Sequence, residues 1–331
     1  MPRTTAGLTV LAALALAACG EKGKATITTG STESTTPSAA ESGATTPVTT
    51  TTSPAGSAPV TYADAESSFR HGDYAEAAGK FESFTRDNPD HAWAQYMLGL
   101  SAWKSGQHDR ALQAFDAALQ LDPAHRKSLL NSARVLLETD QPAEALDRVQ
   151  KALAIEPMSG EGLRLLGRTY AELGRNDEAV DAYQRALAID DKDVWAMNNL
   201  GYLYIQQGRS DAALPPLARA VEIRGNVPVF QNNLGTALER SGHLEAAKTA
   251  FASALQADST YEKASVGLTR VTARIEGTDT NAVDLAALSK QFQDQVEQWR
   301  TAVVPPDSVS TDSTISDSTG SSAMVRDSVT E

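Results

Sequence analysis

The chain of 331 residues carries 29 Lys and Arg against 42 Asp and Glu, which gives a formal net charge of −13 at pH 7. This acidity argues against nucleic acid, and against an anionic membrane surface, as the main partner. The sequence contains one cysteine, so no disulfide can form within the chain.

The first 20 residues, MPRTTAGLTVLAALALAACG, have the pattern of an export signal. Arg3 precedes an apolar run that ends in small residues and a cysteine. The run is too short to span a bilayer, which takes about 20 apolar residues, and no other segment comes near that length. We therefore expect an exported protein without a transmembrane helix.

Residues 16–19, LAAC, resemble the lipobox of bacterial lipoproteins. The resemblance implies that a signal peptide of residues 1–18 is removed and that Cys19 becomes the acylated first residue, held in the lipid bilayer. Two or three acyl chains would make this anchoring essentially permanent. An ordinary signal with a chance cysteine is the alternative. Gly20 is not the aspartate that marks inner-membrane retention, which favours the periplasmic face of the outer membrane.

Two segments of low complexity flank the body of the chain. Residues 19–57 are dominated by Thr, Ser, Ala, Gly and Pro and contain no aromatic residue, so they cannot bury a core. We predict a disordered tether, for which forty flexible residues give a root-mean-square reach of roughly 35 Å. The Ser/Thr/Asp-rich residues 301–331 are predicted to be a disordered tail.

Two stretches of the body repeat each other at a distance of 34 residues. Residues 195–208 read WAMNNLGYLYIQQG, and residues 230–242 read FQNNLGTALERSG. The same spacing relates a series of turn residues, a series of alanines and a series of apolar residues. These are Gly72, Gly106, Asp140, Gly174, Gly208 and Gly242; Ala77, Ala111, Ala145, Ala179, Ala213 and Ala247; and Phe81, Phe115, Val149, Tyr183, Leu217 and Phe251.

The series resemble the tetratricopeptide repeat, a 34-residue helix-turn-helix unit. The fullest copy carries the family's residues at Leu166, Gly167, Tyr170, Gly174, Ala179 and Tyr183. The resemblance implies an all-α fold, a right-handed α-solenoid whose repeats bury a shared core only when they stack. Six repeats are predicted at 58–91, 92–125, 126–159, 160–193, 194–227 and 228–261, and capping helices are predicted in 262–300.

Two repeats depart from the pattern. The first has Asp64 and Ala65 in place of Leu-Gly, so its leading helix is expected to fray most. The fifth has Pro215 and Pro216 inside its second helix, which predicts a late start or a bend.

Two helices are expected after the repeats, at about 261–275 and 281–300. The second has an apolar stripe of Leu285, Leu288, Phe292, Val296 and Trp299. We interpret it as a cap that seals the last repeat, and a dimerising seam is the alternative.

The chain shows no motif typical of catalysis. Its five histidines have neither HxxxH nor HExxH spacing, and no GxSxG, P-loop or GxGxxG sequence occurs. We therefore predict that the protein is not an enzyme and holds no cofactor or metal.

In the resembled family, set positions of the first helices point into a concave groove. The residues implied here are Trp93, Tyr96, Trp103, Lys127, Asn131, Arg134, Arg164, Arg168, Trp195, Asn198, Asn199, Tyr202, Asn232 and Asn233. In each NNLG, both asparagines would face the groove and Leu-Gly would face the core. Paired amides can hold the backbone of an extended peptide. Packing against the first repeat for the aromatic cluster around Trp93 and Trp103, and solvation for the basic residues, are the alternatives.

The sequence thus indicates a membrane-tethered adaptor of the bacterial cell envelope that binds a peptide or helix of another envelope protein in its groove. It resembles lipoproteins that serve as pilus-secretin pilots or peptidoglycan-hydrolase adaptors. The alternatives are a substrate-recruiting subunit of an envelope enzyme complex and a structural oligomer formed through the C-terminal helix. The oligomeric state stays open.

Overall fold

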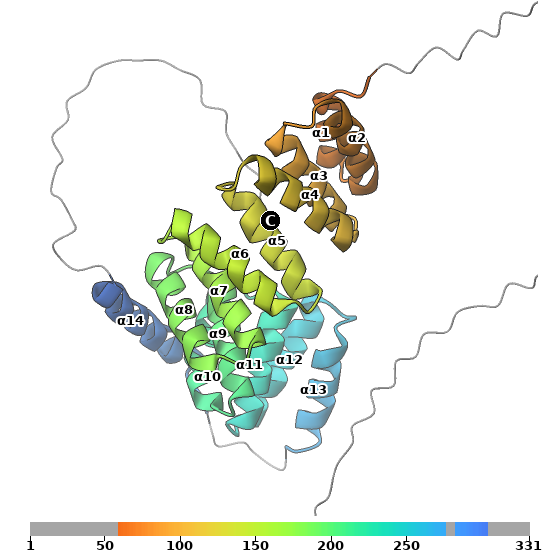
Figure 1. Ribbon diagram of the computed structural model, residues 1–331. Coiled ribbons are helices and arrows are strands. Elements are labelled where there is room, and N and C mark those ends of the chain that lie inside the picture. Colours follow the sequence, from red (N-terminus) through yellow and green to blue (C-terminus); the bar gives the residue numbers. More distant parts are fainter. Residues whose placement is uncertain (1–58, 276–281, 304–331) are drawn as a thin grey trace, which may run out of the picture. The chain divides into compact units, whose positions relative to one another are not determined.

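The computed structural model describes residues 59–275 and 282–303, and within them every regular element is a helix (Figure 1). The predicted signal peptide (1–18), Cys19, the predicted tether (19–57) and residues 304–331 of the predicted tail lie outside the described residues. The helices are α1 Tyr62–His71, α2 Tyr74–Asp87, α3 Ala92–Lys104, α4 His108–Leu121, α5 Arg126–Glu138, α6 Pro142–Ile155, α7 Gly160–Glu172, α8 Asn176–Ile189, α9 Val194–Gln206, α10 Ser210–Ile223, α11 Pro228–Arg240, α12 Leu244–Ala257, α13 Glu262–Thr272 and α14 Leu285–Val303.

Helices α1 to α12 form six consecutive pairs with short turns between them. The first helices of the later pairs recur every 34 residues, beginning at Ala92, Arg126, Gly160, Val194 and Pro228. In the first pair, α1 has 10 residues against 13 in α3, and it lacks the Leu-Gly contact. A capping box between Thr61 and Asp64 nevertheless satisfies the backbone at the beginning of α1.

The turn inside each pair requires a left-handed residue. Five of the six turns have glycine there, with φ between 71° and 86°. In the third pair Asp140 occupies this position with φ of 58°. Aspartate tolerates the left-handed region better than most residues with a side chain, so this turn keeps the shape of the others.

The two helices of a pair approach closely where a glycine faces a large side chain. A Cβ atom added to Gly167 would lie 2.6 Å from Tyr183, and one added to Gly201 would lie 2.5 Å from Leu217. Leu200 and Leu234, which precede the glycines of the two NNLG stretches, are buried. The prediction that Leu-Gly belongs to the core is confirmed.

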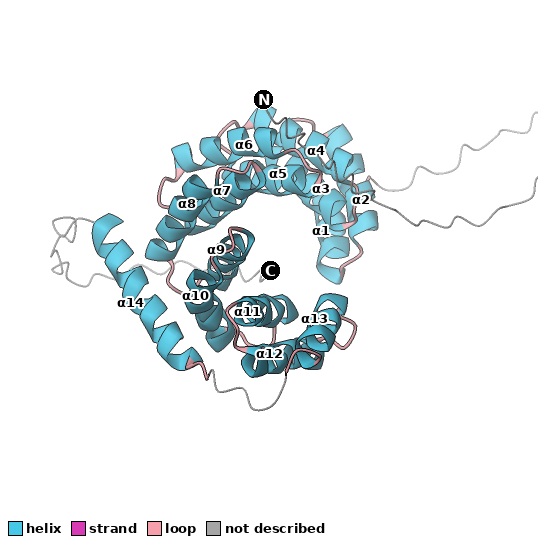
Figure 2. Cartoon of the chain, turned by 90° about the horizontal axis from the view of Figure 1, so that it is seen from below, coloured by secondary structure: helices cyan, strands magenta, loops and turns pink. Residues whose placement is uncertain are grey.

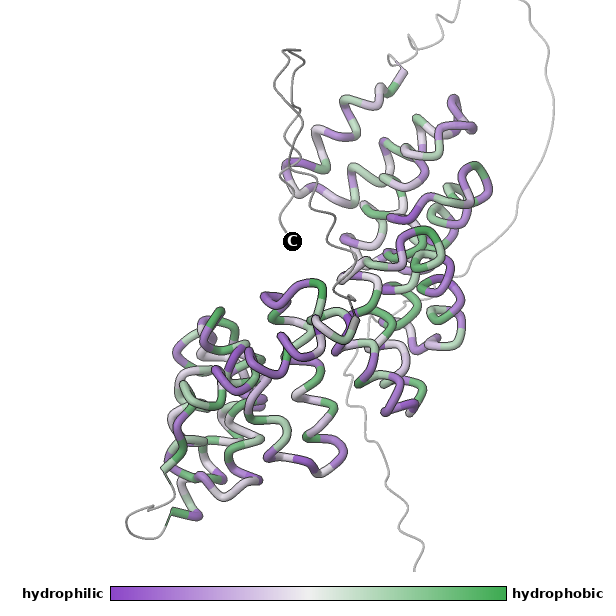
Figure 3. The backbone as a smooth tube through the Cα atoms, turned by 90° about the vertical axis from the view of Figure 1, so that its left-hand side faces the viewer, coloured by the Kyte–Doolittle hydropathy of each residue, from purple (hydrophilic) through white to green (hydrophobic). Residues whose placement is uncertain are grey.

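The pairs stack into a curved, two-layered solenoid. Figure 2 shows α3, α5 and α7 on the inner side of the curve and α4, α6 and α8 on its outer side. Hydrophilic residues gather at the turns between helices, whereas hydrophobic residues lie within the helices (Figure 3). The buried apolar residues form two clusters, one in α1 to α4 with Val135 of α5 and the other from α5 to α14. The partly buried Leu112 packs against both clusters.

Helix α10 does not start late, so that part of the prediction was wrong, and the alternative of a bend stays a prediction. It begins at Ser210, two residues after the turn glycine, as α8 does at Asn176. Pro215 and Pro216 lie inside the helix and are both buried. Because α10 packs against α9, α11 and α14, burial holds the helix in place despite the two missing N–H groups.

Helix α14 lies elsewhere than predicted. The end of the stack is covered by α13, which packs against α11 and α12. Helix α14 instead packs across α8 and α10 of the outer layer (Figures 1 and 2), so the prediction that it caps the last repeat was wrong for α14.

Burial on the outer layer shows what α14 covers. Leu187 on α8 is fully buried, whereas Leu119 and Leu153, at the same position of earlier pairs, are only partly buried. Phe292 and Val296 of α14 are buried in return. The apolar surface that both sides bury stabilises the docking of α14. Because Phe292 and Val296 are buried in this contact, they are not available for a dimerising seam.

An ion-pair cluster attaches α13 to the stack. The carboxylate of Glu239 on α11 is buried, and it accepts hydrogen bonds from Arg270 Nε and Nη2 at 2.8 and 2.6 Å and from Arg274 Nη1 at 2.8 Å. The hydrogen bonds from Arg270 are the main reason that the pKa of Glu239 lies below its usual value.

The glycine contact can be tested with a matched pair of substitutions. Gly201→Ala should lower the free energy of unfolding by about 1–3 kcal/mol, because its methyl group would overlap Leu217. Gly79→Ala is the control, since Gly79 is in a helix with no atom within 4 Å of the new Cβ, and it should raise stability by about 0.5–1 kcal/mol. Chemical denaturation followed by circular dichroism measures both. Shifts of the same sign would contradict the close approach.

The Glu239 cluster predicts a pH-dependent stability. Glu239→Gln should cost about 1–3 kcal/mol at pH 7, because two charge-assisted contacts are lost. A carboxylate with a lowered pKa stabilises the fold above its ordinary value of 4.5, and this contribution disappears as pH falls through the folded-state pKa. The difference in the free energy of unfolding between wild type and Glu239→Gln should therefore shrink as the pH falls from about 5 to about 3, where a glutamate with a lowered pKa becomes protonated. The exposed Glu262→Gln serves as the control, and a constant difference across this range would refute the assignment.

Candidate functional site

The predicted groove residues fall into three sets by exposure. Five are buried, namely Tyr96, Asn131, Asn198, Asn232 and Asn233. Five are partly buried, namely Trp103, Arg134, Arg164, Arg168 and Asn199. Four are exposed, namely Trp93, Lys127, Trp195 and Tyr202.

The buried asparagines bond to each other. Asn232 donates to Asn233 at 3.3 Å, Asn233 donates to Asn198 at 2.9 Å, and Asn198 donates to Asn199 at 3.5 Å. Amides enclosed between stacked helices need partners, and here they find them in the neighbouring repeat. The structure therefore differs from the expectation that both asparagines of NNLG face a ligand, because only Asn199 stays partly exposed.

The same bond occurs between the second and third pairs. Asn131 Nδ2 donates to the hydroxyl of Tyr96 at 3.2 Å, and these residues are 35 positions apart, as Asn233 and Asn198 are. In both places the sixth residue of one repeat bonds to the fifth residue of the repeat before it. These side chains set the register between repeats.

The aromatic cluster of the second pair bridges to the third. The ring centroid of Trp93 lies 5.0 Å from that of Tyr96, and Lys127 Nζ lies 5.1 Å from the ring centroid of Trp93. Trp103 Nε1 donates to Glu138 Oε2 at 2.7 Å. Trp93 keeps 40% of its surface exposed despite these contacts.

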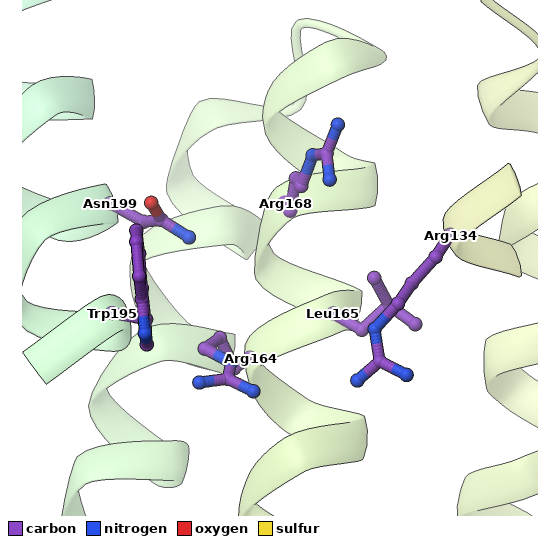
Figure 4. Close-up of a pocket in the computed structure, with 6 residues that line it drawn as sticks. All are labelled: Arg134, Arg164, Leu165, Arg168, Trp195 and Asn199. Carbon is purple, nitrogen blue, oxygen red and sulfur yellow. The ribbon is translucent and has the colours of Figure 1, made fainter. Parts of the chain in front are cut away.

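A cavity of about 240 Å³ opens on the inner layer between α5, α7 and α9 (Figure 4). Its lining residues are Arg134, Arg164, Leu165, Arg168, Trp195 and Asn199. A second cavity of about 270 Å³ shares Arg168 and Asn199 and adds Tyr202, among others. We call the two together the arginine groove, defined by these seven residues.

The three arginines of the groove differ in their partners. Arg134 donates to Asn131 at 2.6 Å and pairs with Glu161. Arg164 pairs at 2.9 Å with the buried Asp193. Among the described residues, Arg168 makes no hydrogen bond or ion pair, so its guanidinium group is available to a ligand.

The position of Asn199 explains why the groove opens at this seam. The residue 35 positions before it is Arg164, where the other two seams have Tyr96 and Asn198. Arg164 is held by Asp193, which also accepts from the backbone N–H groups of residues 195 and 196 at the beginning of α9. Asn199 therefore lacks the bond to the residue 35 positions before it that Asn131 and Asn233 make, and it lines both cavities.

The wall of the second cavity includes the buried Tyr183 of α8. Burial raises the pKa of its hydroxyl well above the ordinary range of tyrosine, so the group is neutral at pH 7. Its hydroxyl also interacts with Asn199.

Several groups of the site were not predicted from the sequence. Leu165, Glu161 and Tyr183 lie at or beside the groove, and Asp193 holds one of its arginines. Asp193 carries a usable signal, because an aspartate just before a helix is a common N-cap. Two of the histidines, His91 and His125, have the same capping role at α3 and α5.

Within the described residues, no group of His, Cys, Asp or Glu side chains is arranged to hold a metal ion. The helices that the structure describes include none with the length and apolarity needed to cross a membrane.

Several models of repeat families match the sequence. Those described as tetratricopeptide repeat match residues 62–126, 102–169, 194–227 and 230–261, and one described as TPR repeat matches residues 167–208. Together they span the chain from residue 62 to residue 261. Among curated proteins, none matches the sequence.

Solved structures of similar fold include PilW, described as a widely conserved type IV pilus biogenesis factor. It is 22% identical, with 63% of this chain and 94% of PilW covered and a TM-score of 0.56. The APC/C hetero-tetramer Cut9–Hcn1 is 19% identical, with 62% and 41% covered and a TM-score of 0.56. The thermophilic protein TTC0263 of Thermus thermophilus is 21% identical, with 55% and 99% covered and a TM-score of 0.49.

At these identities the structural likeness concerns the fold alone. The repeat matches, however, agree with the six stacked helix pairs and with the glycine contact found in four of them. This chain belongs to the tetratricopeptide-repeat family.

Proposed function

We propose that this protein is an interaction scaffold that binds an acidic segment of a partner protein in the arginine groove. Tetratricopeptide-repeat proteins bind partner proteins or peptides, and the groove supplies a specific place for this. The observation that carries the proposal is Arg168, a guanidinium group without a described partner, beside two further arginines in a chain of net charge −13.

The groove has the groups that such a segment needs. Arg168 can hold a carboxylate through two parallel hydrogen bonds, which is the strongest arrangement for this pair. Asn199 can donate to and accept from a peptide backbone. Trp195 and Tyr202 are 38% and 48% exposed, and they offer apolar surface to neighbouring side chains.

The lining residues favour binding over catalysis. Neither cavity of the groove is lined by a serine, cysteine, lysine or histidine, so the groove offers none of the usual nucleophiles next to a base. The role of a substrate-recruiting subunit in an enzyme complex would use the same groove. An oligomer formed through α14 has less support, because Phe292 and Val296 are buried within the chain.

We also propose that the protein acts in the bacterial cell envelope as an adaptor, tethered to the membrane through acylated Cys19. The LAAC sequence at residues 16–19 and the absence of any second cysteine support this anchor. A tether of low complexity would let the folded repeats reach partners away from the bilayer. The outer membrane, at its periplasmic face, is the proposed location.

A charge reversal tests the binding function. The probe is a fluorescein-labelled peptide of ten alternating aspartates and leucines, and its matched control has asparagine in place of aspartate. Arg168→Glu should weaken binding of the acidic probe about tenfold or more, because a charge-assisted contact is worth about 1.5–3 kcal/mol. Rising salt should weaken the wild-type interaction. Fluorescence anisotropy measures the affinities.

Arg185→Glu is the matched control for this test. Arg185 lies on α8 and lines neither cavity, so its reversal should change the affinity less than about twofold, as for a screened surface charge. Both variants should keep the wild-type melting temperature within a few degrees. Equal binding of the acidic and neutral probes, or equal loss in both variants, would reject the groove as an acidic-peptide site.

The lipid anchor predicts a change of location. Cys19→Ser should move the protein from the membrane fraction to the soluble fraction or leave the signal peptide uncleaved, since no acyl chain can be attached. Intact-mass spectrometry of the native mature protein should find its first residue at Cys19 with added acyl chains. A free thiol at Cys19, or a different mature N-terminus, would exclude the anchor.

A further inference from the structure

We propose that the acidic segment after α14, residues 304–331, binds in the arginine groove of its own chain and competes there with partner proteins. This inference rests on the proposed function of the groove. It names the occupant of the groove when no partner is bound, and three observations carry it.

The first observation is where α14 ends. Ser289 bonds to Glu222 of α10 near one end of α14. Near the other end, Arg300 Nε donates to the carbonyl oxygen of Ala188 at 3.3 Å, and its Nη2 lies 3.3 Å from Asp191. Arg300 is three residues before the end of α14. The chain therefore leaves α14 at the turn between α8 and α9.

The second observation is that this turn borders the groove. Asp190, Lys192 and Asp193 line a cavity of about 310 Å³, and Arg164 and Trp195 line it too. Arg164 and Trp195 also line the arginine groove. Arg168 follows Arg164 by one helical turn, which is about 6 Å along α7. A continuous surface thus leads from the end of α14 to the unpaired guanidinium group.

The segment is long enough to follow this surface. Asp307 and Asp312 are four and nine residues beyond Val303. At about 3.4 Å for each extended residue, their side chains can reach about 14 Å and 30 Å from the end of the helix. A helix with its side chains is about 10–12 Å wide, so the second distance covers the path around the turn and onto α7.

The third observation is charge complementarity. Residues 304–331 contain five acidic residues and one basic residue, so their side chains sum to −5 + 1 = −4. The acidic residues are Asp307, Asp312, Asp317, Asp327 and Glu331, and the basic one is Arg326. Three arginines line the 240 Å³ cavity. Arg134 and Arg164 are paired with Glu161 and Asp193, so Arg168 supplies the positive charge that has no ion-pair partner among the described residues. Glu172 lines the second cavity, so the tail would bind on the Arg168 side of the 240 Å³ cavity.

Because the tail is attached to the same chain, even a weak attraction is enough for it to occupy the groove. A short flexible connection holds a segment near its site at an effective concentration in the millimolar range. An acidic segment of another protein would have to displace the tail from the groove. The tail would therefore set the lowest affinity with which a partner can bind. An acidic segment from a second copy of the chain is the rival occupant, and the experiment separates it.

Photo-crosslinking tests the occupant in the full chain. The protein carries Cys19→Ser and Ser313→Cys, and a benzophenone label on the thiol at position 313 is activated by light in dilute solution. Crosslinks mapped by mass spectrometry should concentrate on peptides of α7 and α9. Arg168→Glu should reduce their yield at least fivefold, and so should Asp307→Asn, Asp312→Asn and Asp317→Asn combined. Arg185→Glu should leave the yield unchanged.

Three crosslinking outcomes would contradict the proposal. Crosslinks spread over other helices, a yield that Arg168→Glu does not change, or crosslinks that join two molecules would each overturn the proposal. Binding of the acidic probe peptide gives an independent readout, because the chain with three neutral tail residues should bind it about three to ten times more tightly than wild type. Where the probe binds measurably to both chains, equal affinities would also overturn the tail proposal.

The two proposals are distinguishable. If the tail substitutions change nothing while Arg168→Glu still abolishes probe binding, the groove binds acidic segments but not the tail. If crosslinks reach α7 and α9 but no acidic probe binds to the chain with a neutral tail, the tail proposal stands and the proposed partner function fails.

Discussion

The close approach of two helices at a glycine is the contact on which the rest of this structure depends. Gly167 against Tyr183, and Gly201 against Leu217, leave no room for even a methyl group. Because the spacing within a pair is thereby restricted, successive pairs can stack in one register, and side chains 35 residues apart bond to each other at two of the seams. The groove on the inner layer is a consequence of this stacking, since its residues come from three different pairs.

The sequence predicted the parts of the fold that repeat. A 34-residue period in glycine, alanine and large apolar residues was enough to predict a solenoid of paired helices, because each residue of the pattern makes the same contact in every copy. It also placed Arg164, Arg168 and Asn199 on the inner face. It did not distinguish Asn199 from Asn233, which have the same position in their repeats. The difference arises in the preceding repeat, where Arg164 pairs with Asp193 and does not bond to Asn199.

The misplacement of α14 has a related cause. An apolar stripe shows that a helix needs a partner surface, but it does not say which surface will accept it. The end of the stack was the expected place, yet α13 already covers it and is tied to the buried Glu239 by two arginines. The outer faces of α8 and α10 offered the remaining apolar area. The late start expected for α10 was wrong for a similar reason, since burial of Pro215 and Pro216 outweighs local preference.

The two repeats that α14 joins on the outer layer also supply most of the groove on the inner layer, to which α5 adds Arg134. Helices α7 and α9 supply Arg164, Arg168, Trp195 and Asn199, while their partners α8 and α10 are joined from outside by α14. A solenoid bends most easily at its seams, because each repeat contacts only its neighbours. A helix that contacts both repeats restrains the seam between them. The groove residues on α7 and α9 lie at this restrained seam, so they are held at nearly constant separations, and a ligand that bridges α7 and α9 would lose less conformational entropy on binding there.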